Sequence, residues 1–328
     1  MALELLKKTN TQKGLFAIEK IGLIYNLITT CIIILLFSRM EHSGEMLLGR
    51  AAIVGGMVFL YLLYRAYSCK LTSFLRTAFQ LGLLAYWYPD TYEFNRLFPN
   101  LDHLFATWEQ MIFHSQPAVT FAENFSSAWF SEAFNMGYFA YYPMIFGVAI
   151  FYFLFRYKEF DKTAFILVTS FFIYYLIYIF VPVAGPQYYF PAIGAEEVAA
   201  AHFPAVGDYF NHHTELQPSP GQEWGLFYRL VDASQQAGER PTAAFPSSHV
   251  GISTILLILA YKAKKALFLI LLPFYILLCC ATVYIQAHYL IDAIAGFISA
   301  FLIYGISVWL YTRWFVPVEN LKKKACRN

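Results

Sequence analysis

The sequence predicts an all-α polytopic membrane protein, and three observations support this fold class. Of the 328 residues, 59% are hydrophobic. Only 13% are charged, whereas soluble domains carry roughly 25%. Long apolar stretches also recur along the chain, and about 20 apolar residues suffice for a helix to cross a bilayer. The formal net charge of +2 says little about partners, and we predict no nucleic acid among them.

Eight apolar stretches are predicted to be spanning helices. The third is the weakest because Arg76 and Gln80 interrupt it, so it is either a spanning helix or a re-entrant or interfacial segment. Eight spans also give a consistent alternation of basic and non-basic connecting segments, which favours keeping the third. The predicted spans cover residues 21–37, 51–64, 71–88, 136–155, 163–183, 248–261, 266–287 and 289–309.

The positive charges favour an orientation with both termini in the cytoplasm. With the amino end inside, most of the 23 Lys and Arg residues lie in the inner segments, as expected for cytoplasmic loops. All eight histidines then fall on the outer side. We therefore expect an integral membrane protein whose polar site faces the periplasm or a lumen.

Three parts of the chain are predicted. Residues 1–135 contain N-terminal membrane helices and an outer segment, 89–132, that is expected to form amphipathic helices on the bilayer. Residues 136–312 form a core bundle of five or six helices with a long outer loop, 183–244. Loops of this length often serve as lids or binding loops. Residues 313–328 are a basic cytoplasmic tail.

A first polar motif stands at the start of the sixth predicted span, in Phe245-Pro-Ser-Ser-His. Pro246 sets the turn and Ser247 is a predicted N-cap. Free backbone N–H groups at a helix N-terminus favour anions, so a phosphate fits here against Ser247 and Ser248. His249 in the first turn is placed to donate a proton to a leaving oxygen. The alternative is an ordinary capped helix with a polar first turn.

A second polar motif precedes the last predicted span, where His288 and Asp292 are four residues apart. Ionisable groups at a membrane helix are costly and are usually functional. On one helix face, the Asp292 carboxylate would hydrogen-bond the His288 imidazole and leave its other nitrogen free to attack. The alternative is a buried structural His–Asp hydrogen bond. Two histidines and one aspartate on the same predicted membrane face favour the catalytic interpretation of both motifs.

These two motifs resemble the second and third signatures of the phosphatidic acid phosphatase type 2 superfamily, P-S-x-H and H-x-x-x-D. The resemblance is closest to the inositol phosphorylceramide synthase-like branch, with F-P-S-x-H and T-x-Y-x-x-x-H-Y-x-x-D. It covers roughly residues 136–309. A weaker first signature is Val181-Pro-Val-Ala-Gly-Pro-Gln-Tyr. The residues that fit the two strong signatures are Phe245, Pro246, Ser247 and His249, and then Thr282, Tyr284, His288, Tyr289 and Asp292.

The resemblance implies a phosphohistidine mechanism without metal or other cofactor. His288 would attack the phosphorus of a lipid phosphoester, and Asp292 would orient it. His249 would protonate the leaving group and then act as base towards water or an alcohol acceptor. The residues expected to bind substrate are Ser247, Ser248, Arg240, Gln187, Tyr188 and Thr282.

Two departures bear on the choice between transfer and hydrolysis. Phosphatases of the superfamily carry Ser-Arg seven and six residues before the third-signature histidine, where this chain has Ala281 and Thr282. Their first signature also has Lys and Arg, which are missing before Pro182 and Pro186. The synthase-like branch has the same Thr. Arg240 is either a substitute phosphate clamp or a solvated loop residue.

The favoured function is therefore a phosphotransferase that moves a phosphorylated head group from a glycerophospholipid to a sphingolipid-type alcohol. The alternatives are a lipid phosphate phosphatase acting on phosphatidate, polyprenyl diphosphate or a related lipid monoester, and a transporter or inactive lipid-binding protein. The expected partners are phospholipid and sphingolipid substrates and the bilayer. The sequence does not indicate the oligomeric state.

Other features carry weaker signals. His212, His213 and Glu215 either bind a metal or are solvated, and we predict no metal site. The five cysteines show no pairing or zinc-ligand spacing. Asn124-Phe-Ser is a glycosylation sequon, which matters only in a eukaryotic secretory membrane.

Overall fold

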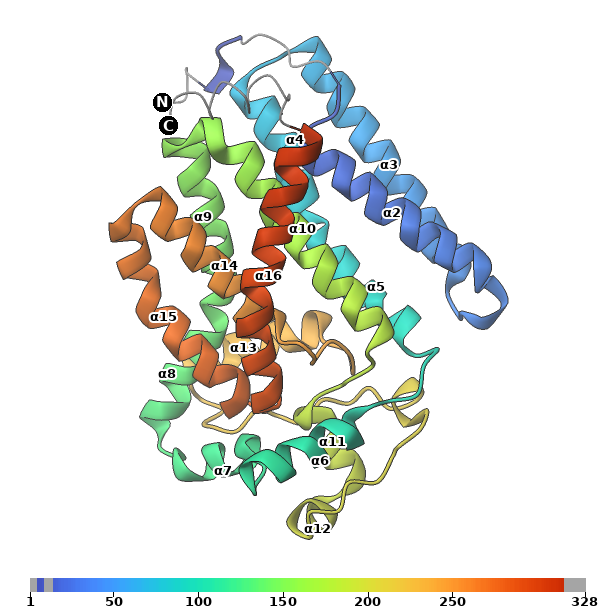
Figure 1. Cartoon of the computed structure of the whole chain (residues 1–328), viewed down its shortest axis with the longest axis vertical. Coiled ribbons are helices and arrows are strands. Elements are labelled where there is room, and N and C mark those ends of the chain that lie inside the picture. Colours follow the sequence, from blue (N-terminus) through green and yellow to red (C-terminus); the bar gives the residue numbers. More distant parts are fainter. Residues whose placement is uncertain (1–4, 9–13, 316–328) are drawn as a thin grey trace. The chain divides into compact units, whose positions relative to one another are not determined.

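The computed structural model describes residues 5–8 and 14–315, and within them the regular secondary structure is helical (Figure 1). Beyond the helices, these residues contain an isolated bridge between Lys8 and Cys69. The predicted basic tail, 313–328, lies almost entirely outside the described residues. The helices are α2 (Ala17–Leu35), η1 (Phe37–Arg39), α3 (Ser43–Ala66), α4 (Lys70–Gly82), α5 (Leu84–Asn95), α6 (Asp102–Phe113), α7 (Pro117–Asn124), α8 (Ala128–Phe139), α9 (Tyr141–Phe155), α10 (Tyr157–Phe180), α11 (Pro186–Ile193), α12 (Ala195–Ala199), η2 (Tyr209–Asn211), α13 (Leu226–Gly238), α14 (Ser248–Ala263), α15 (Lys265–Tyr284) and α16 (Leu290–Phe315).

Six stretches of the described chain are long and apolar enough to cross a membrane. They are α2, α3, α8 with α9, α10, α15 and α16, and they match six of the eight predicted spans. The sixth predicted span is α14, an apolar helix that falls short of the usual spanning length at 16 residues. The protein is therefore an all-α integral membrane protein, as its composition predicts.

The third predicted span is two helices rather than one. α4 ends at Gly82 and α5 begins at Leu84, so the helix is interrupted at Leu83. Pro89 lies inside α5, where it lacks the N–H of one helical hydrogen bond. Arg76 and Gln80 of α4 are buried in spite of their polarity. This segment is consequently shaped by polar contacts inside the protein and not by uniform hydrophobicity.

The chain divides into two compact units, and α9, α10 and α16 each contribute residues to both. Unit 1 comprises residues 1–84, 151–172 and 302–328, and unit 2 comprises residues 85–150 and 173–301. In unit 1, the Tyr25 ring stacks on Phe172 with centroids 4.1 Å apart. The hydroxyls of Ser170 and Ser307 lie 3.2 Å apart. Unit 1 thus has its own core, separate from the residues of the two motifs.

A buried ion pair in unit 1 joins α2 to α4. The Arg76 Nε donates to Glu19 Oε1 at 2.7 Å, and both side chains are almost completely buried. The guanidinium also lies 3.8 Å from the centroid of the Phe16 ring. Burial of a charge is tolerated only where a partner is present, so each member of this pair requires the other.

Replacing Arg76 by Met is expected to destabilise the protein by about 3–5 kcal/mol, because Glu19 is left as a buried charge without its partner. The double variant Glu19→Leu with Arg76→Met is expected to recover most of this loss. Denaturant unfolding in detergent measures both changes. Arg65→Met is the matched control, because Arg65 of α3 is exposed. Equal effects at positions 65 and 76 would contradict this assignment.

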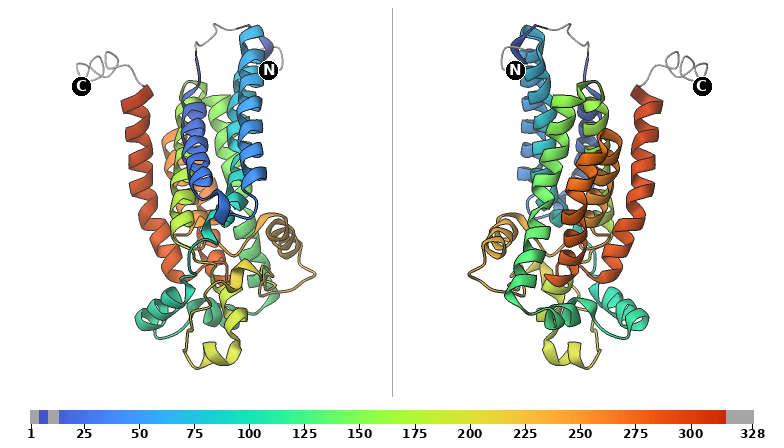
Figure 2. Two further views of the ribbon diagram at one scale, coloured as in Figure 1. Left: turned by 90° about the vertical axis from the view of Figure 1, so that its right-hand side faces the viewer. Right: turned by 90° about the vertical axis from the view of Figure 1, so that its left-hand side faces the viewer.

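In unit 2, α15 packs against α14, α8 and α7, and α13 packs against α8. The predicted outer segment, 89–132, contains α6 and α7, which lie at the C-terminal end of α15 and run across it (Figures 1 and 2). One face of α6 is buried and the other exposes Trp108, Met111 and Ile112. The long loop 183–244 is partly helical, with α11, α12, η2 and α13.

Candidate active site

The first polar motif forms the N-terminal turn of α14. The Ser247 hydroxyl accepts a hydrogen bond from the Val250 N–H at 3.4 Å, which confirms the predicted N-cap. The Ser247 N–H donates to the main-chain oxygen of Asp292 at 3.0 Å. Gly296 of α16 lies so close to Ser247 that a Cβ there would stand 2.3 Å from the Ser247 carbonyl oxygen. The first turns of α14 and α16 are therefore locked together.

The second polar motif places His288 on a short turn between α15 and α16. Gln286 has φ +63°, which reverses the chain after α15. The His288 N–H donates to the Thr282 carbonyl at 3.0 Å. Its ring Nδ1 lies 2.8 Å from the Ala244 carbonyl oxygen. Since a carbonyl can only accept, Nδ1 carries the proton and Nε2 bears the lone pair in the neutral ring.

His249 in the first turn of α14 faces His288 on the turn between α15 and α16. His249 Nδ1 and His288 Nε2 are 3.3 Å apart, and the ring centroids are 5.5 Å apart. His249 packs against the rings of Tyr138 and Tyr141 at 4.6 and 4.5 Å. Burial lowers the pKa of His288 to about 4. His288 is therefore neutral near pH 7, the form in which imidazole is nucleophilic.

Asp292 does not make the predicted hydrogen bond to His288. Its Oδ2 lies 3.9 Å from His288 Nδ1, which is too long, and instead accepts the Tyr289 N–H at 2.9 Å. The prediction of a direct bond is wrong because α16 begins at Leu290, so His288 lies outside the helix and the helical spacing does not apply. Asp292 holds the backbone of the turn, and the Ala244 carbonyl holds the ring.

Two further carboxylates, which the motifs did not indicate, reach the same turn from α6. Asp102 accepts the N–H groups of Ala184 and Gly185 at 2.7 and 2.8 Å and the Tyr289 hydroxyl at 3.1 Å. Asp102 thus ties the weak first signature to the third. An acidic residue on a helix face that is otherwise apolar and buried is the signal in the sequence that points to a role for Asp102.

Glu109 lies further along α6 on the same buried face as Asp102, and it holds the start of α16. Its Oε1 accepts the Leu290 N–H at 2.6 Å, and its Oε2 is buried without a hydrogen-bond partner in the described structure. Burial raises the pKa of Glu109 to about 7, although hydrogen bonds from the Leu290 and Ile291 N–H groups act to lower it. α6 therefore supports the turn that carries His288.

Glu109→Ala is expected to reduce kcat about tenfold, because the buried Leu290 N–H loses its acceptor and the turn loosens, a loss of roughly 1–3 kcal/mol. Glu109→Gln keeps an acceptor oxygen and is expected to retain kcat within a few-fold. Steady-state assays compare these variants with Glu196→Ala, an exposed control on α12. Equal activity of the Ala and Gln variants would contradict a positioning role.

The same residue makes stability depend on pH in a predictable direction. The pKa of Glu109 is raised to about 7 in the folded state. Its stabilising contribution to the free energy of unfolding is therefore fully present below about pH 4.5 and is lost as pH rises through about 7. Thermal unfolding of the wild type should therefore lose more stability between pH 5 and pH 8 than Glu109→Gln. Parallel pH profiles for the two proteins would show that Glu109 does not titrate in this range.

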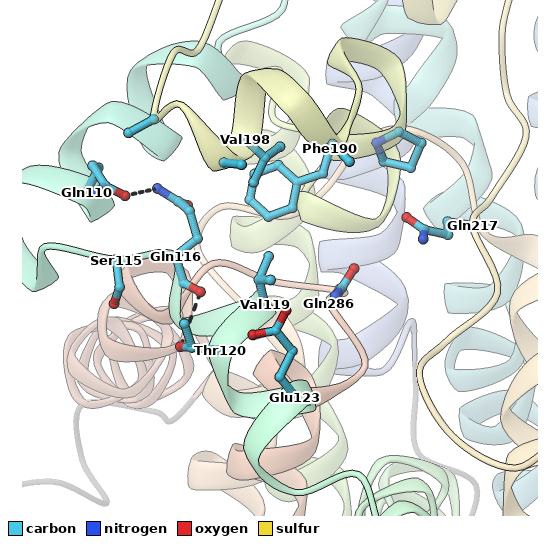
Figure 3. Close-up of a pocket in the computed structure, with 14 residues that line it drawn as sticks. Gln110, Ser115, Gln116, Val119, Thr120, Glu123, Phe190, Val198, Gln217 and Gln286 are labelled. Carbon is cyan, nitrogen blue, oxygen red and sulfur yellow. Dashed lines mark hydrogen bonds between the residues drawn. The ribbon is translucent and has the colours of Figure 1, made fainter.

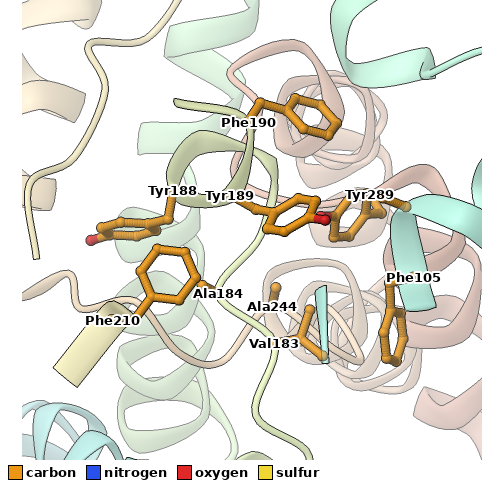
Figure 4. Packing of buried hydrophobic residues seen from close by; sticks show 10 residues of the cluster. Phe105, Val183, Ala184, Tyr188, Tyr189, Phe190, Phe210, Ala244 and Tyr289 are labelled. Atoms are coloured by element: carbon orange, nitrogen blue, oxygen red, sulfur yellow. The ribbon is translucent and has the colours of Figure 1, made fainter. Parts of the chain in front are cut away.

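A cluster of buried rings encloses the turn from the side of the long loop (Figure 4). Tyr289 lies 6.0 Å from the ring of Phe190 and 6.5 Å from that of Phe105. Val183 and Ala244 belong to the same cluster. Since Ala244 also accepts the His288 ring hydrogen bond, packing of this cluster fixes the direction of the His288 imidazole.

Like Ser247, three more of the residues expected to bind substrate make hydrogen bonds that hold the structure around the site. The Thr282 hydroxyl is buried and donates to the Cys279 carbonyl at 2.9 Å, and its main chain holds His288. Gln187 donates to the Gln217 carbonyl at 2.6 Å. The Ser248 N–H donates to the Tyr178 hydroxyl at 3.0 Å. The structure therefore gives these residues supporting contacts, and their contact with substrate stays a prediction.

Arg240 and Tyr188 have different surroundings. The Arg240 Nη1 donates to the neighbouring Glu239 carbonyl at 2.7 Å. The Tyr188 hydroxyl is buried without a hydrogen-bond partner in the described structure. Burial, together with the nearby Glu239, raises the pKa of Tyr188, and Arg240 lowers it. Tyr188 is thus the predicted binding residue that keeps an unused polar group.

Among the described residues, no group of three His, Cys, Asp or Glu side chains is arranged to hold a metal ion. His213 of the loop motif is exposed and stacks on the ring of Tyr209 at 4.0 Å.

Comparison with known proteins identifies the superfamily to which this site belongs. The family model described as PAP2 superfamily matches residues 104–306, a range that includes both histidines, Asp292 and Glu109. No curated protein and no solved structure gives a significant match. The chain belongs to the PAP2 superfamily and is a membrane enzyme of the lipid phosphatase or phosphotransferase type.

Proposed function

We propose that this enzyme is a lipid phosphotransferase of the inositol phosphorylceramide synthase-like branch, which moves a phosphorylated head group from a glycerophospholipid to a sphingolipid-type alcohol. The observation that carries the proposal is the pair of facing ring nitrogens, His288 Nε2 and His249 Nδ1, 3.3 Å apart. One ring has a fixed tautomer with its lone pair directed at the other. This arrangement suits a nucleophile beside a proton-transfer group.

In the first half-reaction, His288 Nε2 attacks the phosphorus of the donor lipid. A phosphorus–nitrogen bond forms and the bond to the diacylglycerol oxygen breaks, while His249 gives a proton to that oxygen. Burial and the neighbouring His288 lower the pKa of His249, so His249 takes up this proton when the anionic phosphate of the donor lies beside it. The His288 ring becomes cationic. The Ala244 carbonyl at 2.8 Å and the Asp292 carboxylate at 3.9 Å from Nδ1 are placed to stabilise this charge.

In the second half-reaction, the alcohol acceptor takes the place of diacylglycerol. His249, now neutral, accepts the hydroxyl proton, and the acceptor oxygen attacks the phosphorus. The phosphorus–nitrogen bond breaks and returns the electron pair to His288 Nε2. With water as the acceptor, the same steps amount to hydrolysis, so the acceptor alone separates the two activities.

The residue at position 282 supports transfer of a diester. A phosphomonoester carries more negative charge than a diester and needs more cationic groups. Thr282, at the position where superfamily phosphatases have arginine, makes its hydrogen bond inside α15. This observation favours a substrate with a single negative charge.

We also propose that both termini are cytoplasmic and that the site faces the periplasm or a lumen. The support is the concentration of Lys and Arg in alternate connecting segments of the sequence. In this orientation the polar head groups react at the outer interface while the lipid tails stay in the bilayer.

Lipid product analysis tests the proposed transfer. Purified enzyme in nanodiscs receives a phosphatidylinositol-type donor plus ceramide, and in parallel phosphatidate alone. The expected result is a new phosphosphingolipid and diacylglycerol, both lost in His288→Ala. Release of inorganic phosphate from phosphatidate, without head-group transfer, would instead assign a phosphatase.

A further inference from the structure

A cavity of about 550 Å³ lies in unit 2 between α6, α7, α11 and α12 (Figure 3). Small-molecule sites commonly have volumes of roughly 300–1,000 Å³. The cavity is distinct from the facing nitrogens of the two histidines, neither of which lines it. The reaction steps described above therefore leave this space without a role.

The polar groups that line the cavity are mainly carboxamides and hydroxyls. Its polar lining consists of Gln110, Ser115, Gln116, Thr120, Glu123, Gln217 and Gln286. Among the described residues, no Lys, Arg or His lines it. Carboxamides both donate and accept hydrogen bonds, which matches hydroxyl groups. The lining offers no cation to a phosphate, and the Glu123 carboxylate disfavours an anion. Ligand hydroxyls can donate to this carboxylate and to the carboxamides, so the lining as a whole fits a hydroxyl-rich ligand.

One carboxamide has an unused acceptor. Gln116 is 5% exposed, and its Nε2 donates to the Ala106 carbonyl at 3.0 Å and to Gln110 Oε1 at 3.1 Å. Its Oε1 is buried without a hydrogen-bond partner in the described structure. Buried polar atoms are rarely left in this state, and a rotation of the Gln116 side chain toward the cavity would let a donor there satisfy this acceptor. The ring of Phe190 lies beside the same space in Figure 3.

We propose that this cavity binds an uncharged polyhydroxylated group of the sugar or polyol type. Its hydroxyls donate to Gln116 Oε1 and exchange hydrogen bonds with the other carboxamides, and a ring face packs on Phe190. The ligand is either a free sugar or polyol or the head group of a lipid, and the two share this chemistry. As a site for a lipid head group the inference rests on the proposed function, whereas binding of a free sugar or polyol is measured without turnover.

The cavity is connected to the reactive turn through the backbone. Gln286 lines the cavity, and its carbonyl accepts the Gln187 N–H at 2.9 Å. His288 follows two residues later on the same turn. Gln110 of the cavity also follows directly on Glu109, which holds the Leu290 N–H. A ligand in the cavity therefore touches both segments that position the nucleophile.

Binding is tested on the full chain in nanodiscs, in a His288→Ala background that removes turnover. Saturation-transfer NMR measures the affinity of glucose, of free inositol and of a short-chain alkyl glucoside, with glucose 6-phosphate as the charged comparison. Gln116→Leu removes the unused acceptor. Val198→Trp fills the cavity and removes no polar group, so it remains informative if the first variant folds poorly. Gln236→Leu is the matched control, an exposed carboxamide outside the cavity.

The expected result is saturable binding of a neutral compound that weakens about tenfold or more in both cavity variants and is unchanged in Gln236→Leu. Preference for the alkyl glucoside would identify a lipid head group, and equal binding of glucose or inositol would identify a free ligand. Either result supports the proposal. Failure of every neutral compound to bind, equal binding in both cavity variants, or tighter binding of glucose 6-phosphate would overturn it.

Discussion

His288→Ala is expected to reduce turnover of the donor lipid by about 10⁴-fold or more, the scale of losses when a covalent nucleophile is removed. The reason is specific to the ring: Nδ1 is held by the Ala244 carbonyl, so Nε2 is the nitrogen expected to attack phosphorus. The measurement is single-turnover release of diacylglycerol. No other described histidine faces His249 in this way.

Two further variants separate chemistry from folding. His288→Asn keeps a side-chain N–H that can donate to the Ala244 carbonyl, so it should fold like the wild type and still be inactive. His212→Ala changes an exposed histidine of the long loop and should have full activity. Substantial turnover by His288→Asn would contradict the assignment of His288 as nucleophile.

His249→Gln is expected to reduce kcat by about 10²–10⁴-fold with a diacylglycerol leaving group, the usual contribution of a general acid. With a nitrophenyl leaving group, which departs without protonation, the first step should lose little. The packing of His249 between Tyr138 and Tyr141 indicates that the ring is held in one place. Rapid-mixing measurement of nitrophenolate release gives the rate of this step directly.

Comparison of the two leaving groups in the same variant provides the control for folding. A His249→Gln protein that releases nitrophenolate rapidly and diacylglycerol slowly is folded and lacks only the acid. An equal loss with both leaving groups would show that His249 acts in some other way, for example by positioning His288.

The spanning helices follow from local sequence, and this part of the fold could be predicted. Continuous apolar runs in α2, α3, α10, α15 and α16 are sufficient to indicate membrane helices. The segment of α4 and α5 could not be predicted in this way. Its break accompanies a buried Arg76 whose partner, Glu19, lies far away in the sequence, and no local pattern reveals such a pairing.

The site could be predicted only in part, for a similar reason. The sequence predicts both histidines at the same ends of their membrane helices, and the structure places their rings next to each other. The predicted hydrogen bond from Asp292 to the His288 ring is wrong. Helical spacing between the two residues requires both to lie in one helix, and α16 begins only at Leu290. Glu109 reaches Leu290 across 181 residues of sequence. Contacts of this range depend on tertiary packing, which hydrophobic periodicity does not encode.

The most direct test of the account is to trap the covalent intermediate. The enzyme is mixed with a head-group-labelled donor lipid without acceptor, quenched at alkaline pH where phosphohistidine survives, digested, and analysed by mass spectrometry. His288 is expected to carry the phosphate together with its head group, and this adduct is expected to disappear when the alcohol acceptor is added before quenching. Product formation with no adduct on His288, or with the adduct on another residue, would contradict it.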